Sequence, residues 1–252
     1  MLKLGNCLDR LSEIEESSVN LCITSPPYNV DLGNNKFNKK KYDVYEDSLP
    51  HEDYIKFLRK VFKHVYKTLT MDGRLCINIG DGKNGQVPTV ANLTAELFDI
   101  GYKPMTTIIW SKKNIGNRTA WGSYMSPSCP SFPTPFEYIL VFYKKHKKLQ
   151  HEGETDLTKH EFIKFANGLW EFPGENSSDH PAAFPMELPH RLIKMLSFIG
   201  DTVLDPFAGS GTTLVAAKRL KRKYIGIEMS DQYFQMCKKR LKSVLKPTWE
   251  RI

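Results

Sequence analysis

Two glycines and a carboxylate lie close together in the segment 202–213, which reads Thr-Val-Leu-Asp-Pro-Phe-Ala-Gly-Ser-Gly-Thr-Thr. The apolar residues before Asp205 predict a short strand, the glycines predict a tight turn, and residues 214–220 predict a helix. Glycine lets the backbone approach a ligand closely, and the start of a helix offers free N–H groups. Asp205 ends the strand, where its carboxylate can face a cation.

The expected ligand of this loop is a nucleoside. Glu228 ends the next predicted strand about 20 residues after the glycines, the spacing at which an acid holds ribose hydroxyls. A P-loop needs lysine after its last glycine, where Thr212 stands, and a dinucleotide loop needs a third glycine where Leu214 stands. The sequence therefore disfavours a phosphate ligand.

A second chemical motif, Ser-Pro-Pro-Tyr-Asn at 25–29, follows the β-prone run 19–24. Two prolines after a strand end its ladder and fix a stiff turn at the edge where α/β enzymes bind ligands. An exocyclic amino group is a poor nucleophile until acceptors hold its N–H groups. The Ser25 hydroxyl oxygen and the Pro26 carbonyl would supply two preorganised acceptors. Tyr28 could stack on a base that has swung out of the duplex.

Other chemistries find little support in the sequence. The Gly-x-Ser-x-Gly motif of a hydrolase nucleophile is absent. None of the five cysteines lies in a Cys-x-x-Cys spacing, so we expect neither a disulfide framework nor a metal site, and a reducing compartment. The N-terminal residues lack a signal-peptide pattern and no apolar run reaches membrane length, which favours a cytoplasmic protein.

The elements that position these motifs alternate between strands and helices. Apolar runs predict strands at 19–24, 74–79, 106–110, 136–143, 203–205 and 223–228. Helical periodicity or a helix-start signal predicts helices near 50–69, 88–101, 187–198, 214–220 and 230–245. This alternation predicts an α/β fold with a doubly wound, mainly parallel sheet. We expect a single domain over 1–252, with loop or target-recognition insertions near 31–49, 111–135 and 149–179.

The chain is basic, with a formal net charge of +8 at pH 7. Its lysines gather in local runs, each of which is by itself more typical of a solvated surface. Because the runs fall near predicted loops, they favour a polyanionic partner. The nucleic-acid contacts expected on this basis are Lys36, Lys39, Lys40, Lys41, Lys144 and Lys145, together with Asn29 of the second motif.

Asp-Pro-Phe-Ala-Gly-Ser-Gly-Thr at 205–212 resembles the S-adenosylmethionine loop of the amino-methylating DNA methyltransferases, and Ser-Pro-Pro-Tyr resembles their catalytic tetrapeptide. With the tetrapeptide first in the chain, the permuted order is similar to that of their β group, which methylates cytosine N4 or adenine N6. The resemblance extends to residues 5–11, 180–185 and 225–228. It implies the Rossmann-like fold of S-adenosylmethionine-dependent methyltransferases.

The resemblance also implies the site residues. Those expected to carry catalysis are Ser25, Pro26, Pro27 and Tyr28. Those expected to bind S-adenosyl-L-methionine are Asn6, Cys7, His180, Pro181, Phe184, Asp205, Pro206, Phe207, Gly209, Gly211, Thr212 and Glu228. Asn6 departs from the aspartate that many relatives carry after the glycine. His180 is equally compatible with an ordinary buried or capping histidine.

Several alternatives stay open. The resemblance favours cytosine N4 over adenine N6, because position 25 is serine, as often in the cytosine enzymes of the family, whereas the adenine enzymes often have aspartate there. Both serine and aspartate can accept an amino hydrogen. An RNA or protein methyltransferase would share the amino chemistry, and a non-catalytic nucleic-acid-binding module would share the fold. We expect double-stranded DNA as partner, with a cognate restriction endonuclease as a further candidate. We expect no membrane partner, a monomer or homodimer, and a place at a prokaryotic nucleoid.

Overall fold

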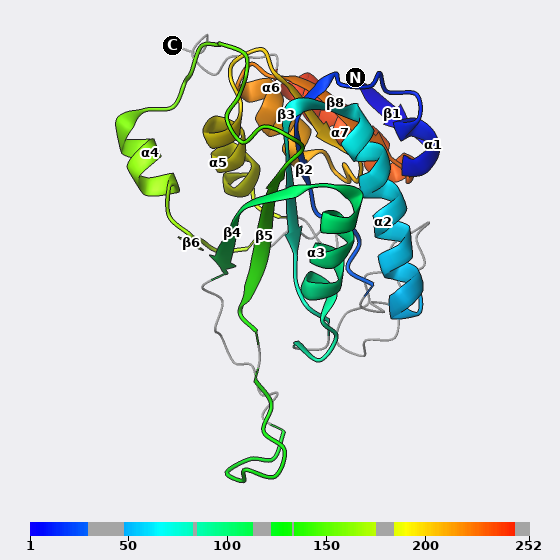
Figure 1. Cartoon of the computed structure of the whole chain (residues 1–252), viewed down its shortest axis with the longest axis vertical. Coiled ribbons are helices and arrows are strands. Elements are labelled where there is room, and N and C mark those ends of the chain that lie inside the picture. The colour runs from blue at the N-terminus through cyan, green and yellow to red at the C-terminus, as the bar shows by residue number, and fades with distance from the viewer. Residues whose placement is uncertain (30–47, 83–84, 113–121, 133, 175–183, 245–252) are drawn as a thin grey trace.

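An open sheet of eight strands forms the centre of the protein (Figure 1). The computed structural model describes residues 1–29, 48–82, 85–112, 122–132, 134–174 and 184–244. The strands are β1 Leu2–Leu4, β2 Val19–Thr24, β3 Leu69–Ile79, β4 Lys103–Ser111, β5 Phe136–Tyr143, β6 Leu169–Glu171, β7 Thr202–Asp205 and β8 Lys223–Glu228. The helices are α1 Cys7–Leu11, α2 His51–Thr68, α3 Thr89–Ile100, α4 Lys159–Phe165, α5 Glu187–Leu196, α6 Thr212–Arg219 and α7 Asp231–Ser243.

The strands lie in the order β1-β8-β7-β2-β3-β5-β4-β6, and only β5 runs antiparallel to its neighbours. From β2 the chain passes through α2 to β3 on one side, whereas from β7 it passes through α6 to β8 on the other. The carboxyl ends of β2 and β7 therefore flank a topological switch point, where open α/β sheets bind ligands.

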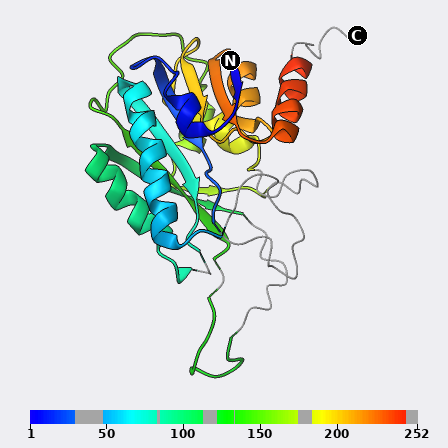
Figure 2. The same ribbon diagram turned by 90° about the vertical axis from the view of Figure 1, so that its right-hand side faces the viewer.

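Helices cover both faces of the sheet (Figure 2). Helices α1, α2 and α3 contribute buried side chains to the core on one face, and α5 and α6 contribute to the core on the other. In α2 the residues Tyr54, Leu58, Val61, Phe62 and Val65 recur at helical spacing and are fully buried. This arrangement confirms the predicted doubly wound, mainly parallel sheet.

Part of the insertion predicted at 149–179 belongs to the sheet itself. β6 pairs in parallel with β4, and α4 precedes it. Trp170 of β6 is buried, and Arg191 of α5 lies 5.0, 5.2 and 4.8 Å from the ring centres of Phe165, Trp170 and Phe172. These contacts hold the segment on the core, so residues 159–165 and 169–171 form regular elements where the sequence showed no period.

Within the segment predicted as an insertion at 111–135, residues 122–132 extend away from the body of the sheet, beyond the carboxyl end of β4 (Figures 1 and 2). Among the described helices, none combines the length and the apolar character needed to cross a membrane.

Candidate functional site

The two chemical motifs meet at the switch point. Thr24, the last residue of β2, donates its hydroxyl hydrogen bond to Oδ1 of Asp205, the last residue of β7, over 2.8 Å. Both residues are buried, and they lie 181 positions apart in the chain. β2 and β7 are hydrogen-bonded neighbours, so this bond places the turn at 25–28 directly beside the glycine loop.

Asp205 is a buried carboxylate that lacks a cationic partner among the described residues. Its Oδ1 also accepts the backbone N–H of Phe207 at 3.1 Å, whereas no described lysine, arginine or histidine nitrogen lies within 4.0 Å of it. Burial raises the pKa of the Asp205 carboxyl to about 6, against the opposing effect of its hydrogen bonds. A site of this kind favours a ligand that brings a positive charge.

The glycine loop depends on left-handed backbone at both glycines. Gly209 has φ 51° and Gly211 has φ 87°, and Gly211 is the residue that precedes α6. A Cβ atom at Gly211 would lie 2.3 Å from the Cys237 Sγ of α7. Arg240 of α7 holds the loop from outside by donating to the Ser210 carbonyl and hydroxyl oxygens at 2.8 and 2.7 Å.

Gly211→Ala is expected to lower the free energy of unfolding by about 2 kcal/mol or more, because it adds a contact with Cys237 to the cost of left-handed backbone. Gly200→Ala is a matched control, since Gly200 has φ 89° and an added Cβ there has no atom within 4 Å. Urea unfolding of both variants separates the two costs. Equal destabilisation would show that the loop does not press on α7.

Glu228 organises the cofactor side through backbone hydrogen bonds. Its carboxylate accepts the N–H groups of Gly209 at 2.7 Å and Ser230 at 2.8 Å, and its carbonyl accepts the N–H of Gly5 at 2.9 Å. It thereby joins the glycine loop, the start of α7 and the N-terminal segment. Sequence reasoning expected an acid at this position but gave no sign of the contacts to Gly209 and Ser230.

The N-terminal segment lies beside Glu228, and its side chains have local partners. Asn6 caps α1 by accepting the Leu8 N–H at 2.9 Å. Cys7 is buried, and burial raises the pKa of its thiol to about 12. Phe184 packs on the opposite face of the sheet, against the core that includes α5. His180 and Pro181 lie outside the described residues.

The Ser-Pro-Pro-Tyr turn is fixed from two directions. The Pro27 carbonyl accepts the Tyr54 hydroxyl of α2 at 2.6 Å. Asn29 exchanges two hydrogen bonds with the backbone of Leu49, at 2.7 and 2.8 Å. Both ends of the turn are thus held, and the acceptors predicted at Ser25 and Pro26 have a defined backbone.

The Tyr28 hydroxyl is the centre of a polar network that sequence reasoning missed. It accepts hydrogen bonds from Ser25 Oγ at 3.0 Å and from Asn78 Nδ2 at 2.8 Å, and it donates a hydrogen bond to Glu137 Oε2 at 2.9 Å. Asn78 is the penultimate residue of β3 and Glu137 is the second residue of β5, and Lys112 pairs with the other oxygen of Glu137. Only the position of Asn78 near a strand's carboxyl end could have signalled this network.

The predicted nucleic-acid contacts are not all available. Lys144 is buried, donates to the Leu69 carbonyl at 2.7 Å and lies over the Tyr66 ring, so this prediction is wrong. Because β5 is antiparallel, Lys144 and the exposed Lys145 lie at the end of the sheet opposite the Ser-Pro-Pro-Tyr turn. Lys36, Lys39, Lys40 and Lys41 lie outside the described residues.

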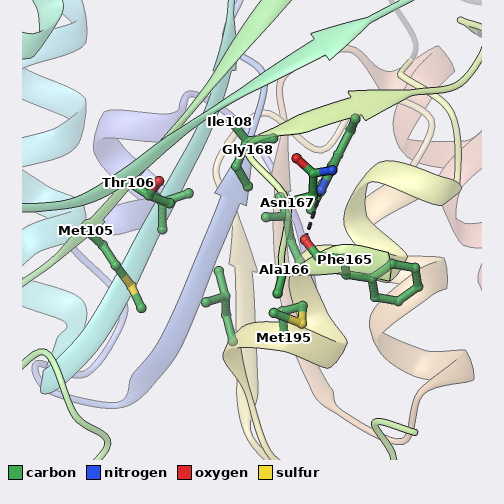
Figure 3. Close-up of a pocket in the computed structure, with 12 residues that line it drawn as sticks. Met105, Thr106, Ile108, Phe165, Ala166, Asn167, Gly168 and Met195 are labelled. Atoms are coloured by element: carbon green, nitrogen blue, oxygen red, sulfur yellow. Dashed lines mark hydrogen bonds between the residues drawn. The ribbon is translucent and has the colours of Figure 1, made fainter. Parts of the chain in front are cut away.

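A separate cavity of about 210 Å³ lies between β4, β6 and α5 (Figure 3). Its wall is mainly apolar and includes Met105, Ile108, Phe165 and Met195, with Asn167 nearby. Neither chemical motif contributes to this wall, and β3 and β5 separate β4 from β2 in the sheet. Within the described ranges, no cluster of three histidine, cysteine or acidic side chains could hold a metal ion.

Known structures of methyltransferases share this fold. A DNA modification methylase of Thermus thermophilus, solved with S-adenosyl-L-methionine, superposes with a TM-score of 0.76 at 32% identity, over 97% of this chain and 93% of that one. The cytosine-N4-specific PvuII DNA methyltransferase superposes with a TM-score of 0.72 at 24% identity, over 95% and 85% of the two chains. The fold and the switch-point site thus define an S-adenosyl-L-methionine-dependent methyltransferase.

Sequence comparison narrows this class. Residues 19–239 match the DNA methylase family N6_N4_Mtase, and the chain belongs to that family. Type II methyltransferase M.MjaVI of Methanocaldococcus jannaschii is 42% identical over 169 residues, which cover 66% of this chain and 83% of the relative. The protein is therefore a DNA methyltransferase of the cytosine-N4 or adenine-N6 type, its cofactor is S-adenosyl-L-methionine, and its relatives serve restriction–modification systems.

Proposed function

We propose that the protein methylates N4 of cytosine in duplex DNA. The observation that carries this proposal is the Thr24–Asp205 hydrogen bond, which sets an amino-group motif and a cation-accepting carboxylate side by side. Serine at position 25 supports cytosine, whereas the likeness to the cytosine-N4-specific PvuII enzyme, at 24% identity, concerns the fold alone. Adenine N6 is the alternative.

The described residues fit the cofactor. When bound, S-adenosyl-L-methionine supplies an activated methyl group on a sulfonium. Asp205 would offset the positive charge at the methionine end of the cofactor, and the burial of this carboxylate without a described cation supports that role. Glu228 would hold the ribose, while Asn6 and Cys7 would line the adenine. Gly209 and Gly211 would let the backbone approach these groups.

On the substrate side, Ser25 and the Pro26 carbonyl would accept the two amino hydrogens of the flipped cytosine. Tyr28 would stack on its ring. The amino nitrogen would bond to the methyl carbon as the sulfonium carbon–sulfur bond breaks and leaves a neutral thioether. The nitrogen would then be cationic and would release one proton to solvent. The acceptors held by the rigid turn stabilise this developing positive charge.

We place DNA sequence recognition in the projecting segment 122–132. The segment exposes Tyr124, Met125 and Phe132 at 67%, 88% and 75%. The backbone at the tip is ordered by the Ser123 hydroxyl, which accepts the Cys129 N–H at 2.9 Å. Apolar side chains on such a projection can contact thymine methyl groups or unstacked bases in a groove.

Phosphate contacts are proposed for the lysines at 36–41, which lie outside the described residues. Replacing Lys39, Lys40 and Lys41 together by alanine should reduce the slope of log affinity against log salt by about 0.9 for each phosphate that the protein no longer neutralises. Lys145→Ala is the control, because Lys145 lies at the far end of the sheet, and its slope should match the unmodified protein. DNA titrations at several salt concentrations measure both. If the slope of the triple variant is unchanged, these three lysines do not contact DNA phosphates.

Incubation with methyl-labelled S-adenosyl-L-methionine and duplex DNA, followed by nucleoside analysis, tests the proposal. N4-methylcytosine is the expected product. If N6-methyladenine is found instead, the protein is an adenine-N6 methyltransferase. Label found only in RNA or protein would overturn both. A cognate restriction endonuclease remains a proposed partner, and action on chromosomal DNA would place the enzyme at the nucleoid.

A further inference from the structure

The Tyr28 hydroxyl has one proton and two lone pairs, and the network uses all three. Asn78 Nδ2 is a pure donor and takes one lone pair at 2.8 Å. Two acceptors compete for the proton, namely Glu137 Oε2 at 2.9 Å and the backbone carbonyl oxygen of Asn78 at 3.2 Å. The bond to the carboxylate is shorter and charge-assisted, so it is the stronger one. The second lone pair is left for Ser25.

This arrangement decides where the Ser25 proton points. Since Tyr28 gives its own proton to Glu137, Ser25 Oγ must be the donor in its 3.0 Å bond with Tyr28. Both lone pairs of Ser25 then remain available to accept an N–H group. A freely rotating serine could instead donate to the ring nitrogen next to the amino group, which is an acceptor in both cytosine and adenine. That bond would not hold the amino hydrogens.

Glu137 is itself held in one orientation. Lys112 pairs with Oε1, which leaves Oε2 to face Tyr28 and Asn78, and Asn78 Nδ2 donates to Oε2 at 2.7 Å. The Glu137 side chain is 12% exposed and Asn78 is 2% exposed. Because Asn78 Nδ2 donates to both Tyr28 and Glu137, these buried contacts favour a single arrangement of donors and acceptors.

We propose that Glu137 is a positioning residue for methyl transfer, which acts through the Tyr28 hydroxyl to keep Ser25 an acceptor for the target amino group. This inference rests on the proposed function. It assigns a role to the second residue of the antiparallel strand β5, which lies 109 positions from Tyr28 in the chain.

Glu137→Gln tests the direction of the network. Lysine can only donate, so the carbonyl oxygen of the introduced amide should turn to Lys112 and its NH₂ group to Tyr28. Tyr28 would then lose its stronger acceptor, and its proton, held only by the longer bond to the Asn78 backbone carbonyl, could turn to Ser25. We expect kcat for methyl transfer to fall about tenfold or more, with KM for DNA and cofactor affinity changed by less than about twofold. Glu152→Gln, which removes an exposed carboxylate of the same size, should keep full activity.

A double-mutant cycle with Tyr28→Phe separates this role from simple support of the fold. If Glu137 acts through the Tyr28 hydroxyl, adding Glu137→Gln to Tyr28→Phe should lower kcat by less than about twofold further. Losses that multiply independently, a full-rate Glu137→Gln enzyme, or a Glu137→Gln protein that loses cofactor binding would each overturn the inference. An unmodified enzyme that methylates no amino group would overturn the proposed function, and this inference with it.

Discussion

Tyr28→Ala is expected to cut methyl transfer to DNA by roughly 5- to 150-fold, because stacking of a base on an aromatic ring contributes about 1–3 kcal/mol. Cofactor affinity should stay within about twofold of the unmodified protein, since Tyr28 belongs to the turn after β2 and the cofactor segments follow β7 and β8. Single-turnover rates and calorimetric titration with S-adenosyl-L-methionine measure the two effects.

Tyr28→Phe divides the role of the ring from that of the hydroxyl. Phenylalanine keeps the aromatic face but cannot bond to Ser25, Asn78 or Glu137, so its rate should lie between those of the unmodified enzyme and Tyr28→Ala. Burial, together with the nearby Glu137, raises the pKa of Tyr28 well above its usual value, which keeps the hydroxyl protonated at neutral pH. A Tyr28→Ala enzyme with full activity would reduce Tyr28 to a packing residue.

Asp205→Asn should have opposite effects on stability and on cofactor binding. The native carboxyl has a pKa of about 6, above its usual 3.8, so the native state binds this proton more tightly than the unfolded chain does. Its contribution to the free energy of unfolding is greatest below about pH 4 and is lost as the pH rises through about 6. At pH 8 the isosteric amide should therefore stabilise the ligand-free protein by up to roughly 3 kcal/mol.

The same amide cannot offset the positive charge of the cofactor, so affinity should fall about tenfold or more. Urea unfolding of both proteins at pH 8 and pH 4.5 supplies the control, because the stability difference should shrink at the lower pH while all other titrating groups are shared. A variant that is less stable at pH 8, or that binds the cofactor normally, would remove Asp205 from its proposed place opposite the methionine end.

The sequence predicted the two motif-bearing turns well, because prolines and glycines impose backbone geometry locally. Gly211 precedes α6 with positive φ, and the prolines follow β2 closely, as expected. The meeting of the turns across the Thr24–Asp205 bond also follows from the alternation of strands and helices, which predicts parallel strands with aligned carboxyl ends.

The positions of Glu137 and Lys144 could not be predicted, because they depend on the reversed direction of β5. Nothing in the run 136–143 shows that β5 is antiparallel, yet this direction brings Glu137 to the site and carries Lys144 away from it. β6 was missed because three residues are too few to show a period. Its middle residue, Trp170, is buried against Arg191, which is distant in the sequence. Long-range pairing overrides local pattern in both cases.

The reversal of β5 also separates the segment proposed to recognise DNA from the Glu137 contacts at the amino-group site. β4 and β5 form a hairpin whose paired ends, Ser111 and Phe136, lie opposite each other, and the Lys112 N–H closes its base on the Pro135 carbonyl at 3.0 Å. The segment beyond this closure can lengthen at small entropic cost. Because Glu137 is anchored below the closure, the segment proposed to recognise DNA could change in length or sequence while the Glu137–Tyr28–Ser25 contacts keep their geometry.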